Sequence, residues 1–335
     1  MLYNILNNCK KGDFMKTYLV TGGAGFIGSN FIRYILKKHD DILVINFDSL
    51  TYAGNLNNLK DIQSDKRYKF VYGDITNESE IDDVFKNYEI DYVINFAAES
   101  HVDNGFIYPE KFIQTNIVGV EKILKVAKKH WGSDIGKRFV QISTDEVYGT
   151  TFEPTDESAK LNPSTIYATT KASADLIALS YFKSYNLPVI ITRSVNNYGP
   201  YQHHEKLIPK IIKSIKENKN ISVYGTGEHI REWIYVLDNC DAIDNILHNG
   251  KNGEIYNIST HNRKKTVEII DFICSYLNKQ NIKCPNLSYT EDRKCNDISY
   301  NIDSTKIEKI CELQKSDFEK TLTDTIKWYM SNDEL

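Results

Sequence analysis

The sequence predicts an α/β protein: a doubly wound parallel sheet with a smaller C-terminal α/β domain. Through the first 195 residues, short apolar runs alternate with segments of helical apolar spacing. This alternation is typical of parallel strands covered by helices on both faces. After residue 195 the rhythm becomes turn-rich and irregular. We therefore expect a second part that packs on the first, with a ligand cleft between them.

The apolar runs give the expected elements in order. Strands are predicted at 16–21, 41–47, 69–72, 91–96, 138–143 and 187–193, and helices at 29–38, 78–87, 109–130 and 164–185. Beyond residue 195 the pattern predicts turns at 196–201, a loop at 225–228, a strand at 254–258, short strands within an irregular stretch at 282–303, and helices at 205–218, 266–279 and 316–331. The domains predicted from this are an extension at 1–14, a nucleotide-binding domain at 15–195 to which 231–258 partly returns, and a substrate domain at 196–335.

Composition excludes several classes of partner. The 335 residues are 41% hydrophobic and 26% charged, as in ordinary globular proteins. The net charge of −4 does not indicate the excess of positive charge that is typical of nucleic-acid-binding proteins. No apolar run approaches the ~18 residues that a membrane span needs. The six cysteines form no Cys-x-x-Cys pair, which indicates reduced thiols, no zinc site and a cytoplasmic location.

A glycine triplet follows the first predicted strand and opens a helix. Gly22 allows the tight turn, Gly25 lets the backbone approach a pyrophosphate, and Gly28 lets the helix pack closely on the strand. Asp48 ends the next strand, where a carboxylate accepts both ribose hydroxyls and repels a 2′-phosphate. The pattern predicts a Rossmann domain that binds NAD. Its other expected contacts follow the first, third and fourth strands: Phe26, Ile27, Asp74, Ile75, Ala97, Ala98 and Ser100.

Two clusters carry the expected chemistry. Tyr167 and Lys171 lie four residues apart, on one face of a helix. A phenol beside an ammonium and a positive nicotinamide can act as a base near neutrality. Asp145 and Glu146 are adjacent, and adjacent like charges push two pKa values apart, so that one carboxyl is neutral and the other ionised.

With the stretch Asn196–Tyr201, which reads NNYGPY, these motifs resemble the extended short-chain dehydrogenase/reductases. Residues 16–330 are most similar to nucleotide-sugar 4,6-dehydratases of the dTDP-glucose type, and the Thr-Asp-Glu triplet at 144–146 is the most specific mark. The resemblance implies a hydro-lyase that oxidises the sugar at C4, eliminates water across C5 and C6, and returns the hydride to C6.

The resemblance also implies a role for each catalytic residue. Tyr167 takes the proton of the 4-hydroxyl, and Thr144 holds the C4 oxygen. Glu146 removes the C5 proton, and Asp145 protonates the departing C6 hydroxyl. Lys171 orients the ribose and lowers the pKa of Tyr167. Residues that match the family's substrate contacts are Asn196, Lys206, Leu207, Tyr224, Arg231, Arg293 and Tyr300, with the two arginines suited to the diphosphate.

Departures from the family pattern affect the substrate more than the reaction. Asn104 and Gly105 replace an Arg and a Ser, and Ser49, Ser222 and Thr266 replace a Lys, a Pro and an Asn. Gly105 is expected to leave room for a larger 2-substituent, such as an acetamido group. The alternatives are therefore a UDP-GlcNAc 4,6-dehydratase, with or without inversion at C5, and a simple 4-epimerase, which leaves the acid pair unexplained. A non-catalytic cofactor sensor would need neither motif.

Three further expectations concern assembly and minor residues. The helices at 109–130 and 164–185 are expected to pair across a two-fold axis into a four-helix bundle, giving the homodimer that the resemblance implies. Asn116 is either a buried cap or a link to the neighbourhood of Lys171. His101, His203 and His204 have no convincing cluster of acidic or cysteine partners at ligand spacing, so no metal site is predicted.

Overall fold

The computed structural model describes residues 16–132, 134 and 136–332. The predicted extension at 1–14 and Cys9 lie outside the described residues. In the described part, no helix is long and apolar enough to cross a membrane.

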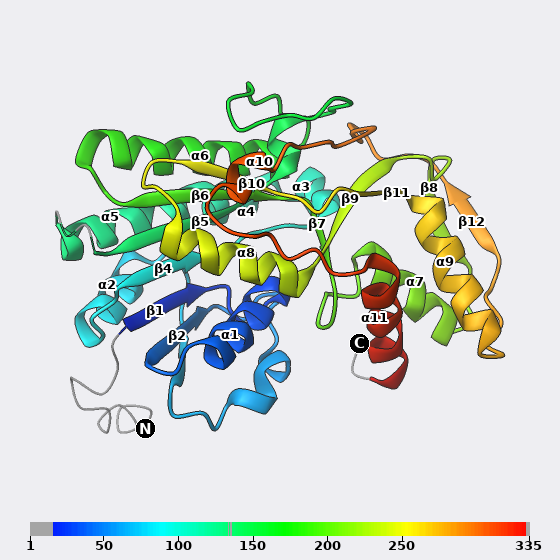
Figure 1. Cartoon of the computed structure of the whole chain (residues 1–335), viewed down its shortest axis with the longest axis horizontal. Helices are drawn as coiled ribbons and strands as arrows, with labels where there is room; N and C mark the ends of the chain where they lie inside the picture. Colours follow the sequence, from blue (N-terminus) through cyan, green and yellow to red (C-terminus); the bar gives the residue numbers. More distant parts are fainter. Residues whose placement is uncertain (1–15, 133, 135, 333–335) are drawn as a thin grey trace.

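A parallel sheet of seven strands forms the centre of the described chain, as predicted (Figure 1). Every neighbouring pair in it is parallel. Its order is β10-β6-β5-β4-β1-β2-β3, so the chain reverses direction across the sheet between β1 and β4. From one edge to the other the strands span Ile255–Ile258, Val189–Ser194, Arg138–Thr144, Tyr92–Asn95, Lys16–Thr21, Ile42–Asp48 and Tyr68–Tyr72.

Helices cover both faces of this sheet. Side chains alternate along each strand, so Tyr18 and Val20 enter one apolar core while Leu19 enters the other. The first core lies under α1 (Phe26–Lys38) and α8 (Val236–Asn249). The second lies under α2 (Glu78–Asn87), α5 (Val120–Trp131) and α6 (Ile166–Tyr185). This two-sided burial explains why the strands read as continuous apolar runs.

The C-terminal part has its own apolar core, shown to the right in Figure 1. It contains a three-stranded sheet of order β11-β9-β7 and the pair β12-β8. These strands span Asn262–Lys265, Ile230–Tyr235, Asn196–Tyr198, Leu287–Thr290 and Ile221–Tyr224. Helices α7 (Leu207–Lys216), α9 (Thr266–Lys279) and α11 (Phe318–Ser331) pack around them, and the short α10 (Thr305–Glu308) lies beside β10.

Several elements differ from the prediction. The stretch 196–201, expected as turns, begins with β7, and α8 and β9 were not predicted as a helix and a strand. Chain 236–258 supplies both α8 and the edge strand β10, so it belongs to the layers of the large sheet. The division into functional domains stays a prediction.

The helix predicted at 109–130 is divided. It consists of α4 (Pro109–Ile113), a π-helical turn at Gln114–Gly119, and α5. A π-turn inserts one residue per turn and often occurs at functional sites. Before it, the short helix α3 (Val102–Ile107) follows the loop after β4. The acid pair itself begins a short 3₁₀ turn, Asp145–Tyr148, which follows β5 directly.

Candidate active site

A cavity of about 470 Å³ lies between the carboxyl ends of the sheet strands and the C-terminal part. Ligands bind at this end of doubly wound sheets. The predicted residues that line it at the cofactor end are Gly22, Gly25, Phe26, Ile27, Gly28, Asp48, Asp74, Ile75, Ala97, Ala98 and Ser100. Those at the other end are Thr144, Glu146, Tyr167, Lys171, Asn196, Lys206, Leu207, Tyr224, Arg231, Arg293 and Tyr300. Asp145 does not line the cavity.

The glycine loop has the shape of a phosphate cradle. Gly22 has φ +68°, and a Cβ there would lie 2.6 Å from the Ala97 backbone nitrogen. A Cβ on Gly28 would lie 2.4 Å from the Gly22 carbonyl oxygen, so both positions require glycine. A Cβ on Gly25 would approach only that same carbonyl, at 3.3 Å, which leaves its outer side open to a ligand. The residues present therefore fit a dinucleotide on the N-terminus of α1.

Asp48 is fixed at the end of β2. Its carboxylate accepts hydrogen bonds from the backbone N–H of Ala24 at 2.9 Å and of Leu50 at 2.8 Å. These bonds tie the glycine loop to the strand end where a ribose would lie. Burial raises the pKa of Asp48, and the two backbone hydrogen bonds oppose that rise.

The π-turn places Asn116 behind the cavity. Its side chain accepts from the Glu99 N–H at 2.8 Å and donates to the Glu99 carbonyl at 3.0 Å. It also donates to the Thr170 hydroxyl at 2.9 Å, beside Lys171. Of the two alternatives for Asn116, the link to the Lys171 neighbourhood is the one found. It joins the loop after β4 to α6.

The acid pair follows β5 in two different environments. Asp145 is 1% exposed, and its Oδ2 has no hydrogen-bond partner, while Oδ1 accepts from the Thr144 hydroxyl at 3.2 Å. Burial and the charges of Glu146 and Glu232 raise the pKa of Asp145 well above its usual range.

Glu146 faces the cavity and is only half-buried. Burial raises its pKa as well, but the nearby cations of Arg231 and Lys206 oppose the rise. The pKa values of the two carboxyls therefore differ in the predicted direction, because Asp145 favours the protonated form more strongly than Glu146 does.

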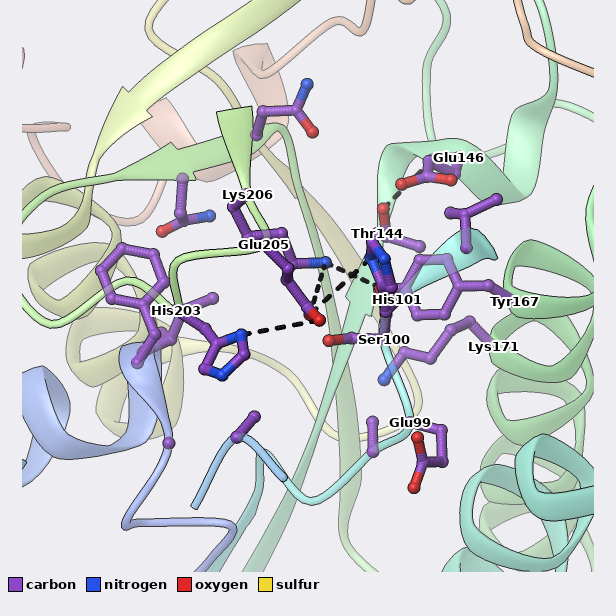
Figure 2. Close-up of a pocket in the computed structure, with 18 of the residues that line it drawn as sticks. Glu99, Ser100, His101, Thr144, Glu146, Tyr167, Lys171, His203, Glu205 and Lys206 are labelled. Atoms are coloured by element: carbon purple, nitrogen blue, oxygen red, sulfur yellow. Dashed lines mark hydrogen bonds and ion pairs between the residues drawn. The ribbon is translucent and has the colours of Figure 1, made fainter. Parts of the chain in front are cut away.

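Tyr167 and Lys171 project from α6 toward Thr144 (Figure 2). The Lys171 ammonium donates to the carbonyl of Ile142. Burial lowers the pKa of Lys171 to about 8, against the opposing charge of Asp175. Burial and the two carboxylates raise the pKa of Tyr167, and a hydrogen bond with Thr144 lowers it only in part. The charges of the protein itself thus oppose ionisation of the phenol.

A buried charge network supports α6 from behind. Arg193 in β6 donates through Nε to Asp175 Oδ2 at 2.9 Å, and the Ser143 hydroxyl donates to the same oxygen at 3.0 Å. Arg193 also donates to the Tyr148 hydroxyl at 2.9 Å. Because Asp175 follows Lys171 by one helical turn, this network positions the face that carries the catalytic pair.

The sugar end of the cavity has an aromatic and cationic wall. The Arg231 guanidinium lies 4.7 Å from the centre of the Tyr300 ring, and its Nη2 donates to Asn296 Oδ1 at 3.0 Å. Tyr300 donates to Asp297 Oδ2 at 2.8 Å. Asp297 is also held by the hydroxyls of Thr150 and Ser164, at 2.8 and 2.6 Å. This arrangement fixes Tyr300 beside Glu146.

Glu205 is a cavity residue that the sequence reading did not identify. It lies near His101 and His203, with an oxygen 3.7 Å from His101 Nδ1 and 3.5 Å from His203 Nδ1 (Figure 2). Burial lowers the pKa of His101. Lys206 donates to the Ser100 carbonyl at 2.8 Å. The adjacent Glu-Lys pair just before α7 was the available signal.

The departures from the family pattern fall into two groups. Ser49, Ser222 and Thr266 line the cavity. Gly105 does not: it is buried in α3, and a Cβ there would lie 3.5 Å from Phe112 and 3.6 Å from Ile166. The expectation that Gly105 makes room for a larger 2-substituent is therefore wrong, because it faces α4 and α6 rather than the sugar.

One group of metal-binding residue types lies outside the cavity. Within the described ranges, His39, Asp244 and His248 bring their potential ligand atoms within 4.8 Å of one another. His39 Nε2 is 3.0 Å from Asp244 Oδ1, and the Lys38 ammonium is 3.0 Å from Asp244 Oδ2. An ammonium on the carboxylate disfavours a cation there, so we interpret the group as an ion-pair cluster joining α1 to α8.

Comparison with known proteins shows the family of the chain. The GDP-mannose 4,6 dehydratase family model matches residues 19–325. The dTDP-glucose 4,6-dehydratase of Salmonella typhimurium is 41% identical over 94% of this chain and 92% of its own length. That of Haemophilus influenzae is 41% identical over 95% and 99%.

Solved structures of similar proteins have the same fold. The dTDP-glucose 4,6-dehydratase of Bacillus anthracis, in complex with NAD, superposes with a TM-score of 0.86 at 42% identity, covering 95% of this chain and 98% of that one. The Streptomyces venezuelae enzyme, also with NAD, gives 0.88 at 38%, covering 94% and 97%. A UDP-glucuronic acid 4-epimerase from Bacillus cereus is 24% identical and covers 94% and 99%, and its TM-score of 0.86 shows a shared fold alone. The chain belongs to the GDP-mannose 4,6-dehydratase family of nucleotide-sugar dehydratases.

Proposed function

We propose that the protein is an NAD-dependent NDP-hexose 4,6-dehydratase acting on a substrate of the dTDP-glucose type. The observation that carries the proposal is the acid pair at 145–146, adjoining a cavity that also holds Tyr167 and a dinucleotide cradle. A 4-epimerase needs only the tyrosine and the cofactor. The enzyme is a hydro-lyase that yields a 4-keto-6-deoxy sugar.

The chain's residues divide the proton transfers. Bound NAD supplies the hydride acceptor for C4 and the donor for C6. Tyr167 takes the 4-hydroxyl proton, and it needs the positive charge of a nicotinamide because the protein's own carboxylates raise its pKa. Thr144 holds the C4 oxygen. Glu146, opposite Arg231 and Lys206, takes the C5 proton and returns it. Asp145, whose pKa is raised by burial, donates to the leaving C6 oxygen.

The remaining contacts bind the substrate. Lys171 orients the cofactor ribose. Arg231 and Arg293 hold the diphosphate, since a guanidinium grips two oxygens in one plane. Asn196, Lys206, Leu207, Tyr224 and Tyr300 surround the sugar and nucleotide. The argument for an acetamido sugar depended on space at Gly105, and Gly105 faces Phe112 instead of the sugar. Glucose is therefore the preferred hexose.

We also propose a homodimer formed through α4, the π-turn, α5 and α6. Large apolar side chains are exposed on these helices: Ile113 is 45% exposed, Leu176 59% and Tyr185 50%. Apolar side chains that gather on one helical layer are typical of a protein–protein interface.

The cytoplasmic location expected from the cysteines stays a prediction. All five described cysteines are free.

The function is tested by incubating the purified protein with dTDP-glucose, UDP-glucose and UDP-GlcNAc. We expect a 4-keto-6-deoxy product from dTDP-glucose, detected by its absorbance in alkali and by NMR signals at C4, C5 and C6. A product epimerised at C4 with its C6 oxygen retained would contradict the proposal.

A further inference from the structure

The loop that leads into α7 supplies one wall of the cavity and begins at a turn that lies mostly outside it. The turn comprises residues 199–202, directly after β7. Of these, only Gln202 lines the cavity, and it is followed there by His203, Glu205, Lys206 and Leu207. Whatever fixes the turn therefore also fixes where the next residues of the loop lie.

The turn has a conformation that its own residues do not favour. Tyr201 has φ +70°, in the left-handed region that bulky side chains rarely adopt. Such backbone strain persists only where surrounding contacts hold it. The Arg33 guanidinium of α1 lies 4.1 Å from the centre of the Tyr201 ring, and the Trp328 ring of α11 lies 4.7 Å from it. These contacts hold the turn from outside.

One hydroxyl joins the two ends of the turn. Tyr329 of α11 is 0% exposed, and its hydroxyl donates to the Gln202 carbonyl at 2.8 Å and to the Gly199 carbonyl at 3.1 Å. A phenol has a single proton, so the two carbonyls share it. Burial raises the pKa of Tyr329, and the phenol therefore stays a donor near neutrality.

A second side chain holds the turn from the cofactor side. Asn30 of α1 donates through Nδ2 to the Pro200 carbonyl at 3.0 Å. The carbonyls of 199, 200 and 202 are thus all paired with side chains of α1 or α11. Figure 1 shows α11 beside α7, the helix that the loop enters. The turn is therefore fixed between the helix that begins at the glycine loop and the C-terminal helix.

Lys206 is the substrate contact that this turn delivers. Its backbone N–H donates to the His203 carbonyl at 3.0 Å, so only a tight loop separates it from the turn. Its ammonium donates to the Ser100 carbonyl at 2.8 Å (Figure 2). Lys206 thereby joins the loop before α7 to the loop after β4, and a shift of the turn would change this position in the cavity.

We propose that Tyr329 is a positioning residue for substrate binding: its hydroxyl holds the turn at 199–202 and thereby holds Lys206 in the cavity. The inference rests on the proposed function, in which Lys206 contacts the sugar nucleotide. Tyr329 does not line the cavity, so it acts through the turn.

The test separates substrate binding from chemistry. Tyr329→Phe keeps the ring and removes the hydroxyl. In the proposed role Lys206 holds the substrate before and during the reaction alike, so we expect KM for dTDP-glucose to rise about 10-fold while kcat stays within about 2-fold of wild type. An unchanged KM would overturn the proposal.

The matched control removes another hydroxyl from the same helix. Thr321 of α11 has its hydroxyl 2.6 Å from the Tyr198 hydroxyl, and neither residue lines the cavity. Thr321→Val should leave KM within about 2-fold of wild type. An equal rise of KM in the two variants would assign the effect to the packing of α11 in general and would overturn the role of the turn.

A double-mutant cycle tests whether the effect passes through Lys206. If it does, adding Tyr329→Phe to Lys206→Met should lower kcat/KM by less than about 2-fold, because the side chain that the turn positions is already gone. Effects of the two changes that multiply would overturn the proposal. Should Tyr329→Phe fail to fold, Asn30→Ala, which frees the Pro200 carbonyl, takes its place with the same expected rise in KM and the same cycle.

A second readout does not depend on turnover. In the holoenzyme, hydrogen exchange of the peptide that covers 199–210 should be at least about 5-fold faster in Tyr329→Phe than in wild type, and unchanged in Thr321→Val. Equal exchange in Tyr329→Phe and wild type would overturn the proposal. If the wild-type protein forms no dehydrated product, the proposed function fails, and this measurement alone decides whether Tyr329 holds the turn.

Discussion

Arg293 forms a two-point ion pair with Asp103: Nε lies 2.9 Å from Oδ1, and Nη2 donates to Oδ2 at 2.9 Å. The guanidinium also stacks 4.5 Å from the centre of the Tyr224 ring, and the Tyr224 hydroxyl donates to Asp103 Oδ2 at 3.3 Å. These contacts join α3 to the irregular segment before Tyr300. They hold the planar fork of Arg293 in place at the cavity.

The first prediction concerns Arg293→Lys. A lysine keeps the charge but cannot bind two oxygens of a diphosphate in one plane, so we expect the Kd for dTDP to rise about 10-fold, or about 1.4 kcal/mol. Isothermal titration calorimetry measures it. Arg67→Lys, at an arginine that pairs with Asp65 outside the cavity, should leave the Kd unchanged. An unchanged Kd in Arg293→Lys would remove Arg293 from the diphosphate site.

The second prediction separates oxidation from elimination. Glu146→Gln removes the base for the C5 proton, so we expect kcat for dehydration to fall by about 10²–10⁴-fold. Oxidation at C4 does not need Glu146, and the absorbance of reduced nicotinamide should therefore build up after substrate is added. Glu153→Gln, at an exposed carboxylate, should behave as wild type. Loss of both steps together would argue against the assigned role.

The third prediction is a pH dependence of stability. Burial lowers the pKa of Lys171 to about 8 in the folded protein, below the ordinary lysine value of 10.5. Between these two values the unfolded chain binds more protons than the folded one, so the free energy of unfolding rises with pH in this window. We expect wild type to gain about 2–3 kcal/mol relative to Lys171→Met between pH 8 and pH 10.5.

Urea denaturation at several pH values measures this difference. Lys86→Met, at an exposed lysine, serves as the matched control. Wild type should show no such gain in the free energy of unfolding relative to this variant. A gap between wild type and Lys171→Met that stays constant with pH would mean that Lys171 keeps its ordinary pKa.

The fourth prediction compares two Asp–Arg pairs. Asp175→Asn leaves Arg193, which is 2% exposed, without its counter-charge, and we expect a loss of about 3–5 kcal/mol in the free energy of unfolding. Asp61→Asn breaks an ion pair with Arg33 in which the Asp61 side chain is 55% exposed, and should cost less than about 1 kcal/mol. Similar losses in the two variants would show that the buried network contributes little.

The fifth prediction tests assembly. Leu176→Glu places a charge among the exposed apolar side chains of α6, so we expect the proposed dimer to dissociate into monomers in analytical ultracentrifugation. Tyr72→Glu changes a residue that is 68% exposed at the end of β3, away from these helices, and should not alter the mass. A dimer that persists in Leu176→Glu would place the interface elsewhere.

The local signals in the sequence were sufficient for the cofactor end. Gly22, Gly25 and Gly28 have the turn, the open approach and the tight packing that their spacing predicts. The strands beside them were readable because burial on both faces makes them continuously apolar. Helix α8 was missed although Val236, Cys240, Ile243 and Leu247 repeat at helical spacing and are buried.

Other features had no local signal. His261 Nδ1 lies 3.5 Å from Glu232 Oε1, and nothing in the residues around Glu232 predicts that neighbour. The π-turn at 114–119 also has no local signal, because its residues have the pattern of an ordinary α-helix. Gly105 was placed at the sugar because residues on both sides of it belong to a motif, but the helical turn of α3 directs it toward Phe112.

The contribution of chain 236–258 to the large sheet limits how this enzyme can be recombined. β10 pairs with β6, and α8 packs against β6 and β10 on the face of the sheet that α1 also covers. A gene fragment ended at residue 195 would expose the backbone of β6 as a free edge and uncover an apolar face, both of which favour aggregation. Chimaeras that exchange the sugar-binding part between relatives should therefore keep this segment with its own N-terminal half.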